Sequence, residues 1–233
     1  MEKGIITKPD DALNIIQKPA TRLQFLRFSG LAMASTALVM AGCKKDNNDP
    51  DMVNLGSGDI GILNYAYALE QLEAAFYTQV VSSYYSGISS DEMAVLADIQ
   101  KHEVGHRDFF KAAIGTSAII DLTFDFSSVD FSSRASVLGT AKAFEDLGVS
   151  AYNGAGKLIV SGDYLLIAGK IVSVEARHAA AIRDLLNPNS ADFAGDDVVD
   201  GSGLDGAKAP SAVLAIAGTY IKNSIDASNL PTS

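Results

Sequence analysis

Residues 96–110 have the sequence LADIQKHEVGHRDFF, in which a glutamate and a histidine interrupt an apolar helical stripe. Alternate steps of three and four residues follow one face of a helix. Here these steps give Leu96, Ile99, Glu103, His106 and Phe110, and in residues 164–185 they give Ile171, Glu175, His178 and Ile182. The glutamate and histidine of each pair are three residues apart, so both can project from the same helix face into a core.

Two further apolar-periodic segments each carry a glutamate that is followed by a tyrosine seven residues later. The pairs are Glu70 with Tyr77 in residues 60–83, and Glu145 with Tyr152 in residues 133–160. The Glu/Tyr pair recurs after 75 residues and the Glu/His pair after 72 residues. The chain therefore contains an internal repeat of two helix pairs.

The lengths of the connections predict how four such helices are arranged. The segments span residues 60–83, 91–114, 133–160 and 163–186, and only the connection between the second and third is long. Short, long, short is typical of a four-helix bundle with one crossover. We therefore predict an all-α fold whose bundle occupies residues 60–190, with a long crossover between helices 2 and 3. Residues 191–233 should form a loop and an extra helix over 210–226, packed on the bundle.

The amino-acid composition and net charge disfavour some classes of binding partner. The 233 residues are 48% hydrophobic and 20% charged, which suits one globular domain with a sizeable core. The formal net charge of −10 disfavours nucleic acid and acidic membrane surfaces as partners, because the phosphates would repel the protein.

The N-terminal residues have the features of an export signal. Residues 28–42, FSGLAMASTALVMAG, are uncharged but fewer than the roughly 20 apolar residues that span a bilayer. Cys43, the only cysteine, follows directly and precedes a polar run. This arrangement resembles a bacterial lipoprotein signal. The resemblance implies a signal peptide at 1–42, lipidation of Cys43, a lipid-anchor tether at 43–59, and an exported protein at the cell envelope, on the periplasmic side or the outer membrane.

The polar residues of the four stripes form a candidate metal site. Four buried carboxylates cannot stay charged and unpaired, because desolvating each costs several kcal/mol. Two divalent cations would neutralise all four, and oxygen-rich ligation with one imidazole for each metal suits iron or manganese. The predicted ligands are Glu70, Glu103, His106, Glu145, Glu175 and His178.

Four neighbouring residues leave alternatives open. Glu73 is a possible ligand in place of Glu70, although only Glu70 shares the seven-residue spacing of the repeat. Tyr77 and Tyr152 can hydrogen-bond ligating carboxylates, or serve only as core aromatic residues. His102 points about a quarter-turn away from the stripe and is expected at the surface or beside a ligand.

The stretch from residue 60 to 186 resembles the ferritin-like di-iron carboxylate proteins, and most closely their desiccation-related branch. LNYAYALEQLEAAFY at 63–77 and LADIQKHEVGHRDFF carry the resemblance, and all six ligand positions are matched. It implies two iron ions, with manganese possible, and oxidation chemistry with dioxygen, peroxide or ferrous ion in stress protection. The bundle could also form a homodimer. The alternative is a non-enzymatic, stress-protective envelope bundle without redox-active metal.

Overall fold

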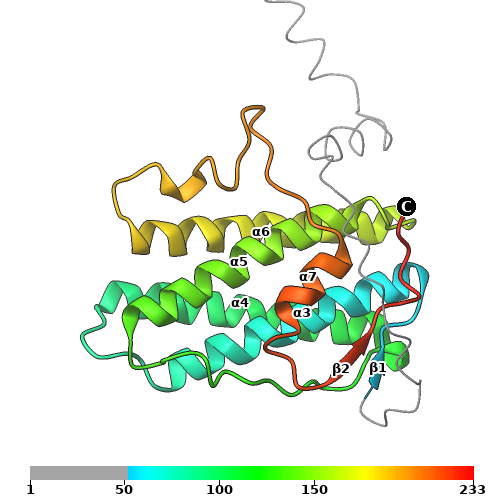
Figure 1. The fold of residues 1–233 in the computed structure, drawn as a ribbon, viewed down its shortest axis with the longest axis horizontal. Helices are drawn as coiled ribbons and strands as arrows, with labels where there is room; N and C mark the ends of the chain where they lie inside the picture. Colours follow the sequence, from blue (N-terminus) through cyan, green and yellow to red (C-terminus); the bar gives the residue numbers. More distant parts are fainter. Residues whose placement is uncertain (1–51) are drawn as a thin grey trace, which may run out of the picture. The chain divides into compact units, whose positions relative to one another are not determined.

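Four long helices make up most of residues 52–233, the part of the chain that the computed structural model describes (Figure 1). They are α3 (Gly58–Ser82), α4 (Ser90–Ile114), α5 (Arg134–Gly156) and α6 (Gly162–Leu186). The expected all-α bundle is confirmed. The predicted signal peptide, Cys43 and the tether up to residue 51 lie outside the described residues. Among the described helices, none combines the length and the apolar character that crossing a membrane requires.

The helix ends follow local sequence signals. The side chain of Ser89 accepts a hydrogen bond from the Glu92 backbone N–H, and the Glu92 carboxylate accepts one from the Ser89 backbone N–H. This capping box satisfies backbone donors that the first turn of α4 would otherwise leave unpaired. At the other end, Gly115 adopts a φ of 63° and ends α4, a conformation that glycine tolerates without steric cost.

The helices pair in sequence order, α3 with α4 and α5 with α6, and the two pairs pack through α3 against α5 and α4 against α6. A long crossover, residues 115–133, joins the pairs as predicted. Two buried amide side chains connect the first part of α3 to neighbouring segments of the chain. Asn64 donates to the carbonyls of Leu55 and Ser117, and the Gln71 side chain accepts from the Leu122 N–H. These bonds satisfy backbone groups that lie away from water.

The C-terminal residues close over the bundle, but the expected helix is shorter than predicted. Helix α7 runs only from Pro210 to Ala217 and packs against α5 and α3. The rest of the predicted helix turns at Gly218 and continues as strand β2 (Ser224–Asp226). This strand pairs in parallel with β1 (Met52–Asn54), which lies within the segment expected to be tether (Figure 1). Backbone pairing with β1 therefore outweighs the helical periodicity there.

The chain approaches α5 closely just before α7. The Lys208 N–H donates to the Ser150 carbonyl, and a Cβ added at Gly154 would lie 1.8 Å from the Lys208 carbonyl oxygen. Only glycine fits such a contact. Gly154 therefore allows the C-terminal segment to pack directly on the surface of α5.

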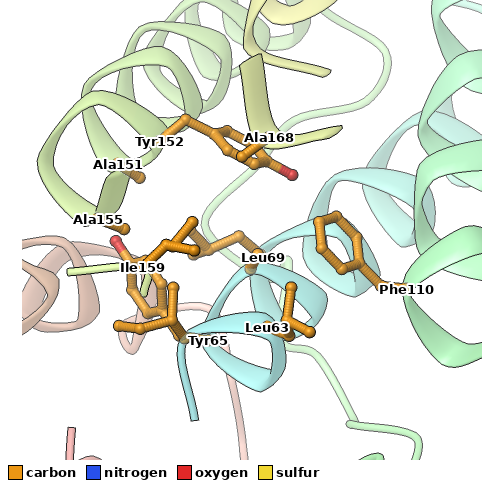
Figure 2. A pocket seen from close by; sticks show the side chains of 11 residues that line it. Leu63, Tyr65, Leu69, Phe110, Ala151, Tyr152, Ala155, Ile159 and Ala168 are labelled. Atoms are coloured by element: carbon orange, nitrogen blue, oxygen red, sulfur yellow. The ribbon is translucent and has the colours of Figure 1, made fainter. Parts of the chain in front are cut away.

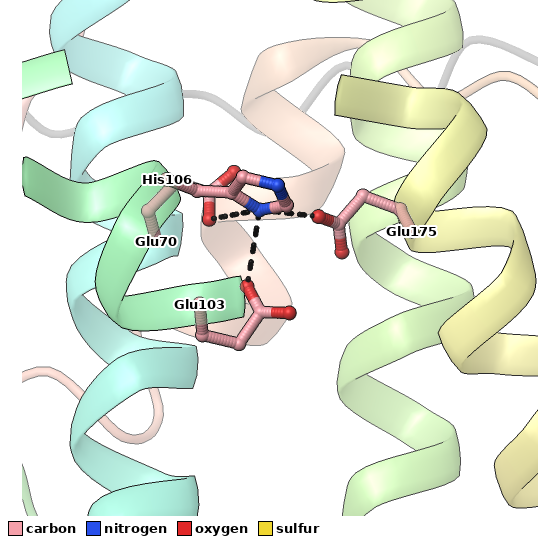
Figure 3. A group of neighbouring side chains, drawn as sticks. All are labelled: Glu70, Glu103, His106 and Glu175. Carbon is pink, nitrogen blue, oxygen red and sulfur yellow. Dashed lines mark ion pairs between the residues drawn. The ribbon is translucent and has the colours of Figure 1, made fainter. Parts of the chain in front are cut away.

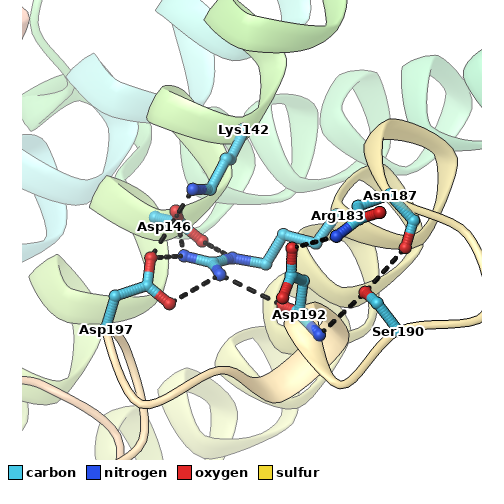
Figure 4. Close-up of polar contacts among 7 residues, drawn as sticks. All are labelled: Lys142, Asp146, Arg183, Asn187, Ser190, Asp192 and Asp197. Atoms are coloured by element: carbon cyan, nitrogen blue, oxygen red, sulfur yellow. Dashed lines mark hydrogen bonds and ion pairs between the residues drawn. The ribbon is translucent and has the colours of Figure 1, made fainter.

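A buried arginine fixes the loop that follows α6 (Figure 4). The Arg183 guanidinium donates to both carboxylate oxygens of Asp146 on α5 and of Asp197 in the loop, at 2.8–3.0 Å. It also donates to the backbone carbonyl of Asp192, in the short helix η2 (Asp192–Ala194). Bidentate pairs of this kind hold a planar guanidinium in one orientation, so Arg183 ties the loop to the α5–α6 pair.

Candidate metal site

Each of the four long helices contributes to one polar cluster inside the bundle. Glu70 comes from α3, Glu103 and His106 from α4, Glu145 from α5, and Glu175 and His178 from α6. All four glutamates are fully buried, His178 is 4% exposed, and the His106 side chain is 14% exposed. The structure therefore brings together all six residues that the sequence predicts as ligands.

The six residues form two overlapping groups, and in each group the possible ligand atoms lie within 4.8 Å of one another. One group has Glu70 and His106, and the other has Glu145 and His178. Glu103 and Glu175 belong to both groups. Two adjacent positions thus share two carboxylates, and each also has one carboxylate and one imidazole of its own.

The imidazole nitrogens face the carboxylates at short distances. His106 Nδ1 lies 2.9 Å from Glu175 Oε1 and 3.4 Å from Glu70 Oε2, and it lies 3.6 Å from Glu103 Oε2 (Figure 3). In the second group, His178 Nδ1 lies 2.8 Å from Glu103 Oε1 and 3.5 Å from Glu145 Oε2. Both rings therefore present Nδ1 to the cluster and direct Nε2 away from it.

Two tyrosines hold the outer carboxylates, and each reaches across the bundle. Tyr77 on α3 donates its hydroxyl proton to Glu145 Oε1 on α5 at 2.6 Å. Tyr152 on α5 donates to Glu70 Oε1 on α3. Each outer glutamate thus has one oxygen fixed by a tyrosine. The sequence could predict such bonds, but it could not predict that they cross between the helix pairs.

The remaining inner atoms lie close to one another but lack partners in hydrogen-bond geometry. Eight buried atoms of the cluster have none: Glu70 Oε2, Glu103 Oε1 and Oε2, His106 Nδ1, Glu145 Oε2, Glu175 Oε1 and Oε2, and His178 Nδ1. Buried polar atoms in folded proteins are nearly always paired. A set of six carboxylate oxygens and two imidazole nitrogens, all pointing inward, is the donor set that an iron or manganese ion accepts. The residues therefore fit a metal site.

Protons balance the charges when metal is absent. Burial raises the pKa of Glu70 to about 7 and raises the pKa of Glu175 and Glu145 as well. Burial would also raise the pKa of Glu103, but the two histidines hold it at about 2. Burial alone would lower the pKa of His178, but the surrounding carboxylates raise it to about 10. The metal-free cluster therefore keeps protonated histidines beside a mixture of ionised and protonated acids.

Glu73, the alternative ligand on α3, is buried beside the cluster but belongs to neither group. A Cβ added at Gly148 on α5 would lie 3.1 Å from Glu73 Oε1 and 3.7 Å from Glu175 Oε2. The absence of a side chain at position 148 therefore leaves room for the Glu73 carboxyl. Burial and the four nearby glutamates raise the pKa of Glu73 well above its usual range, which favours its neutral form.

An apolar cavity adjoins the α3–α5 side of the cluster. Eleven residues line it, and the cavity wall includes Leu69 next to Glu70 as well as the Tyr152 ring (Figure 2). Its volume is about 20 Å³, and the apolar wall offers few partners to a water molecule. This side of the cluster is therefore bordered by apolar side chains.

Sequence comparison gives a result in agreement with this geometry. The ferritin-like domain family matches residues 58–188, which include all four long helices and all six clustered residues. A comparison with curated proteins found no match.

Proposed function

We propose that this chain, which belongs to the ferritin-like domain family, binds two iron ions in its bundle and reacts with dioxygen or peroxide. The observation that carries the proposal is the set of eight buried ligand atoms without hydrogen-bond partners, in two overlapping groups. A single ion would leave one of the two groups unpaired. Two divalent ions would instead neutralise the four carboxylates and engage both imidazoles.

The proposed role of each residue follows from its group. Glu70 and His106 would hold one ion, Glu145 and His178 would hold the other, and Glu103 and Glu175, which belong to both groups, would serve both. Tyr77 and Tyr152 keep the outer carboxylates turned inward. Two bound ferrous ions would supply two electrons, enough to reduce dioxygen to peroxide, or hydrogen peroxide and two protons to two waters. Manganese suits the same oxygen-rich ligands and is the alternative metal.

The surroundings support a reaction inside the bundle rather than bulk storage of metal. The four glutamates are fully buried, and the cavity beside Tyr152 has an apolar wall. Among residues 52–233, the clustered residues that could hold a metal ion are confined to these two groups. We therefore favour the removal of ferrous ion and peroxide, or of dioxygen, as a protective activity.

We further propose that the protein acts at the cell envelope, attached by a lipid on Cys43. The support is the sequence alone: an uncharged stretch at 28–42, then the only cysteine of the chain, then a polar run. Ferrous ion and peroxide that arrive from outside would meet the protein there first.

The test begins with full-length protein purified without added metal. Anaerobic titration with ferrous ion should saturate near two ions per chain, and addition of peroxide or dioxygen should then oxidise them. Glu103→Gln removes a charge that both groups share and should abolish most binding and oxidation. Glu73→Gln, a matched change of a buried glutamate outside both groups, should retain both. Metal binding without oxidation would overturn the redox proposal, and equal behaviour of the two variants would overturn the assignment of the site.

A further inference from the structure

The outer nitrogen of one of the two clustered histidines has a hydrogen-bond partner. His178 Nε2 lies 2.9 Å from His102 Nδ1, and the planes of the two rings differ by only 7°. His102 is on α4, directly before Glu103, and its side chain is exposed. An N–H of one ring can therefore point at the lone pair of the other.

An ion on Nδ1 and this contact on Nε2 together require one tautomer of His178. A neutral imidazole carries one N–H and one lone pair. His178 Nδ1 faces the carboxylates and would offer its lone pair to an ion, so the proton must be on Nε2. His102 Nδ1 can accept that proton in a hydrogen bond. Partners of this kind fix the orientation of a ligating imidazole and make it a stronger donor to metal.

The other histidine lacks this support. The 72-residue repeat that relates His106 to His178 relates His102 to Val174 on α6. A valine side chain has no hydrogen-bond acceptor. Among residues 52–233, no hydrogen bond is found to His106 Nε2, whereas the carboxylates and tyrosines of the two groups match one another. His102 therefore distinguishes the two positions, as does Glu73, whose equivalent in the 75-residue repeat is Gly148.

We propose that His102 is a positioning residue that makes the two metal positions unequal. The position of Glu145 and His178 binds its ion more tightly and fills first, and the position of Glu70 and His106 fills second and releases its ion more readily. This inference rests on the proposed binding of two ions. Loss of a hydrogen-bond partner of a ligating histidine usually weakens metal binding by about 10–100-fold, and we expect a difference of this size between the two steps.

The experiment is a titration of metal-free, full-length protein with cobalt(II), monitored by calorimetry and visible absorption. Wild-type protein should bind two ions in two separate steps. His102→Val copies the residue at the equivalent position 174 and should weaken the tight step by about 10–100-fold, so that the two steps merge. His102→Asn places an amide oxygen near the position of Nδ1 and should restore most of the separation. Lys101→Val, an exposed neighbour on the same helix, should change neither step.

A readout of the His178 Nε2–H separates positioning from simple packing. Nitrogen NMR of zinc-loaded protein, in which Nδ1 is occupied by the ion, should show the His178 Nε2–H in a hydrogen bond and protected from exchange with water in the wild type and in His102→Asn. In His102→Val the same Nε2–H should lack this bond and exchange faster. Two equal steps in the wild type, or equal weakening of both steps by His102→Val, would overturn the inference while leaving the two-metal proposal intact. A wild-type protein that binds no cobalt would overturn both.

Discussion

Removing the metal with a chelator should make the protein less stable as the pH rises from 4.5 toward 7. Burial raises the pKa of Glu70 from 4.5 in the unfolded chain to about 7 in the folded protein. A group with a raised folded-state pKa stabilises the fold fully below its unfolded pKa, and this contribution is lost as the pH approaches the folded value. At about 1.4 kcal/mol per pH unit, Glu70 alone accounts for a loss of about 3 kcal/mol.

Other groups of the cluster do not cancel this loss. The pKa values of Glu145 and Glu175 are also raised, so their contributions fall in the same direction. The pKa of Glu103 is lowered to about 2, so its contribution is complete above pH 4.5 and declines only in stronger acid. The raised pKa of His178 adds a further loss only above pH 6.5.

Thermal melts across this range, with and without metal, measure the effect. A loss of about 3 kcal/mol corresponds to a fall in the midpoint of about 6–12 °C for a domain of this size. Metal-loaded protein should not show the fall, because deprotonated ligands bind metal more strongly as the pH rises. Metal-free Glu70→Gln should show a smaller fall than metal-free wild type. A metal-free wild type with a constant midpoint from pH 4.5 to 7 would refute the reasoning, since its carboxylates would then ionise at no cost.

Three further predictions concern other parts of the chain. Glu70→Ala should weaken metal binding at least about tenfold more than Glu73→Ala, because only Glu70 belongs to a ligand group; titration that finds the reverse order would move the ligand to Glu73. Gly154→Ala should destabilise the fold by about 1–3 kcal/mol or more, because its Cβ would meet a backbone carbonyl. Gly139→Ala, at an open position in the same helix, should instead stabilise it by about 0.5–1 kcal/mol in urea denaturation. Cys43→Ser should abolish labelling by a radioactive fatty acid and release the protein from membranes; persistent labelling would contradict the lipoprotein hypothesis.

The four long helices could be predicted because their apolar periodicity extends over many turns. The long crossover could be predicted from loop lengths alone. The parallel pair of β1 and β2 could not, because each strand has three residues and the two lie far apart in the chain. Strands this short carry no detectable alternation. Part of the C-terminal sequence also has helical spacing, which concealed the strand that follows Gly218.

The cluster shows a similar division between local and long-range information. Spacing along single helices identified the six residues that the structure brings together. The same spacing could not indicate that Tyr77 bonds Glu145 on another helix, because the choice of partner depends on how α3 and α5 cross. Nor could the spacing predict that His102 contacts His178, because this contact depends on how α4 and α6 pack against each other. Gly148 could be recognised as leaving room for the Glu73 carboxyl only once the position of Glu73 was known.

The crossed tyrosines have a consequence for how such a cluster can be built. The α3–α4 hairpin supplies Tyr77 for the glutamate of the other hairpin, and the α5–α6 hairpin supplies Tyr152 in return. Two identical hairpins related by a two-fold rotation would satisfy both bonds, so the cluster has the geometry of a symmetric dimer interface held within one chain. A dimer of identical hairpins must place the same residue on both sides of its axis. Joining the halves by the crossover removes that constraint, and it allows one half to carry His102 where the other carries Val174.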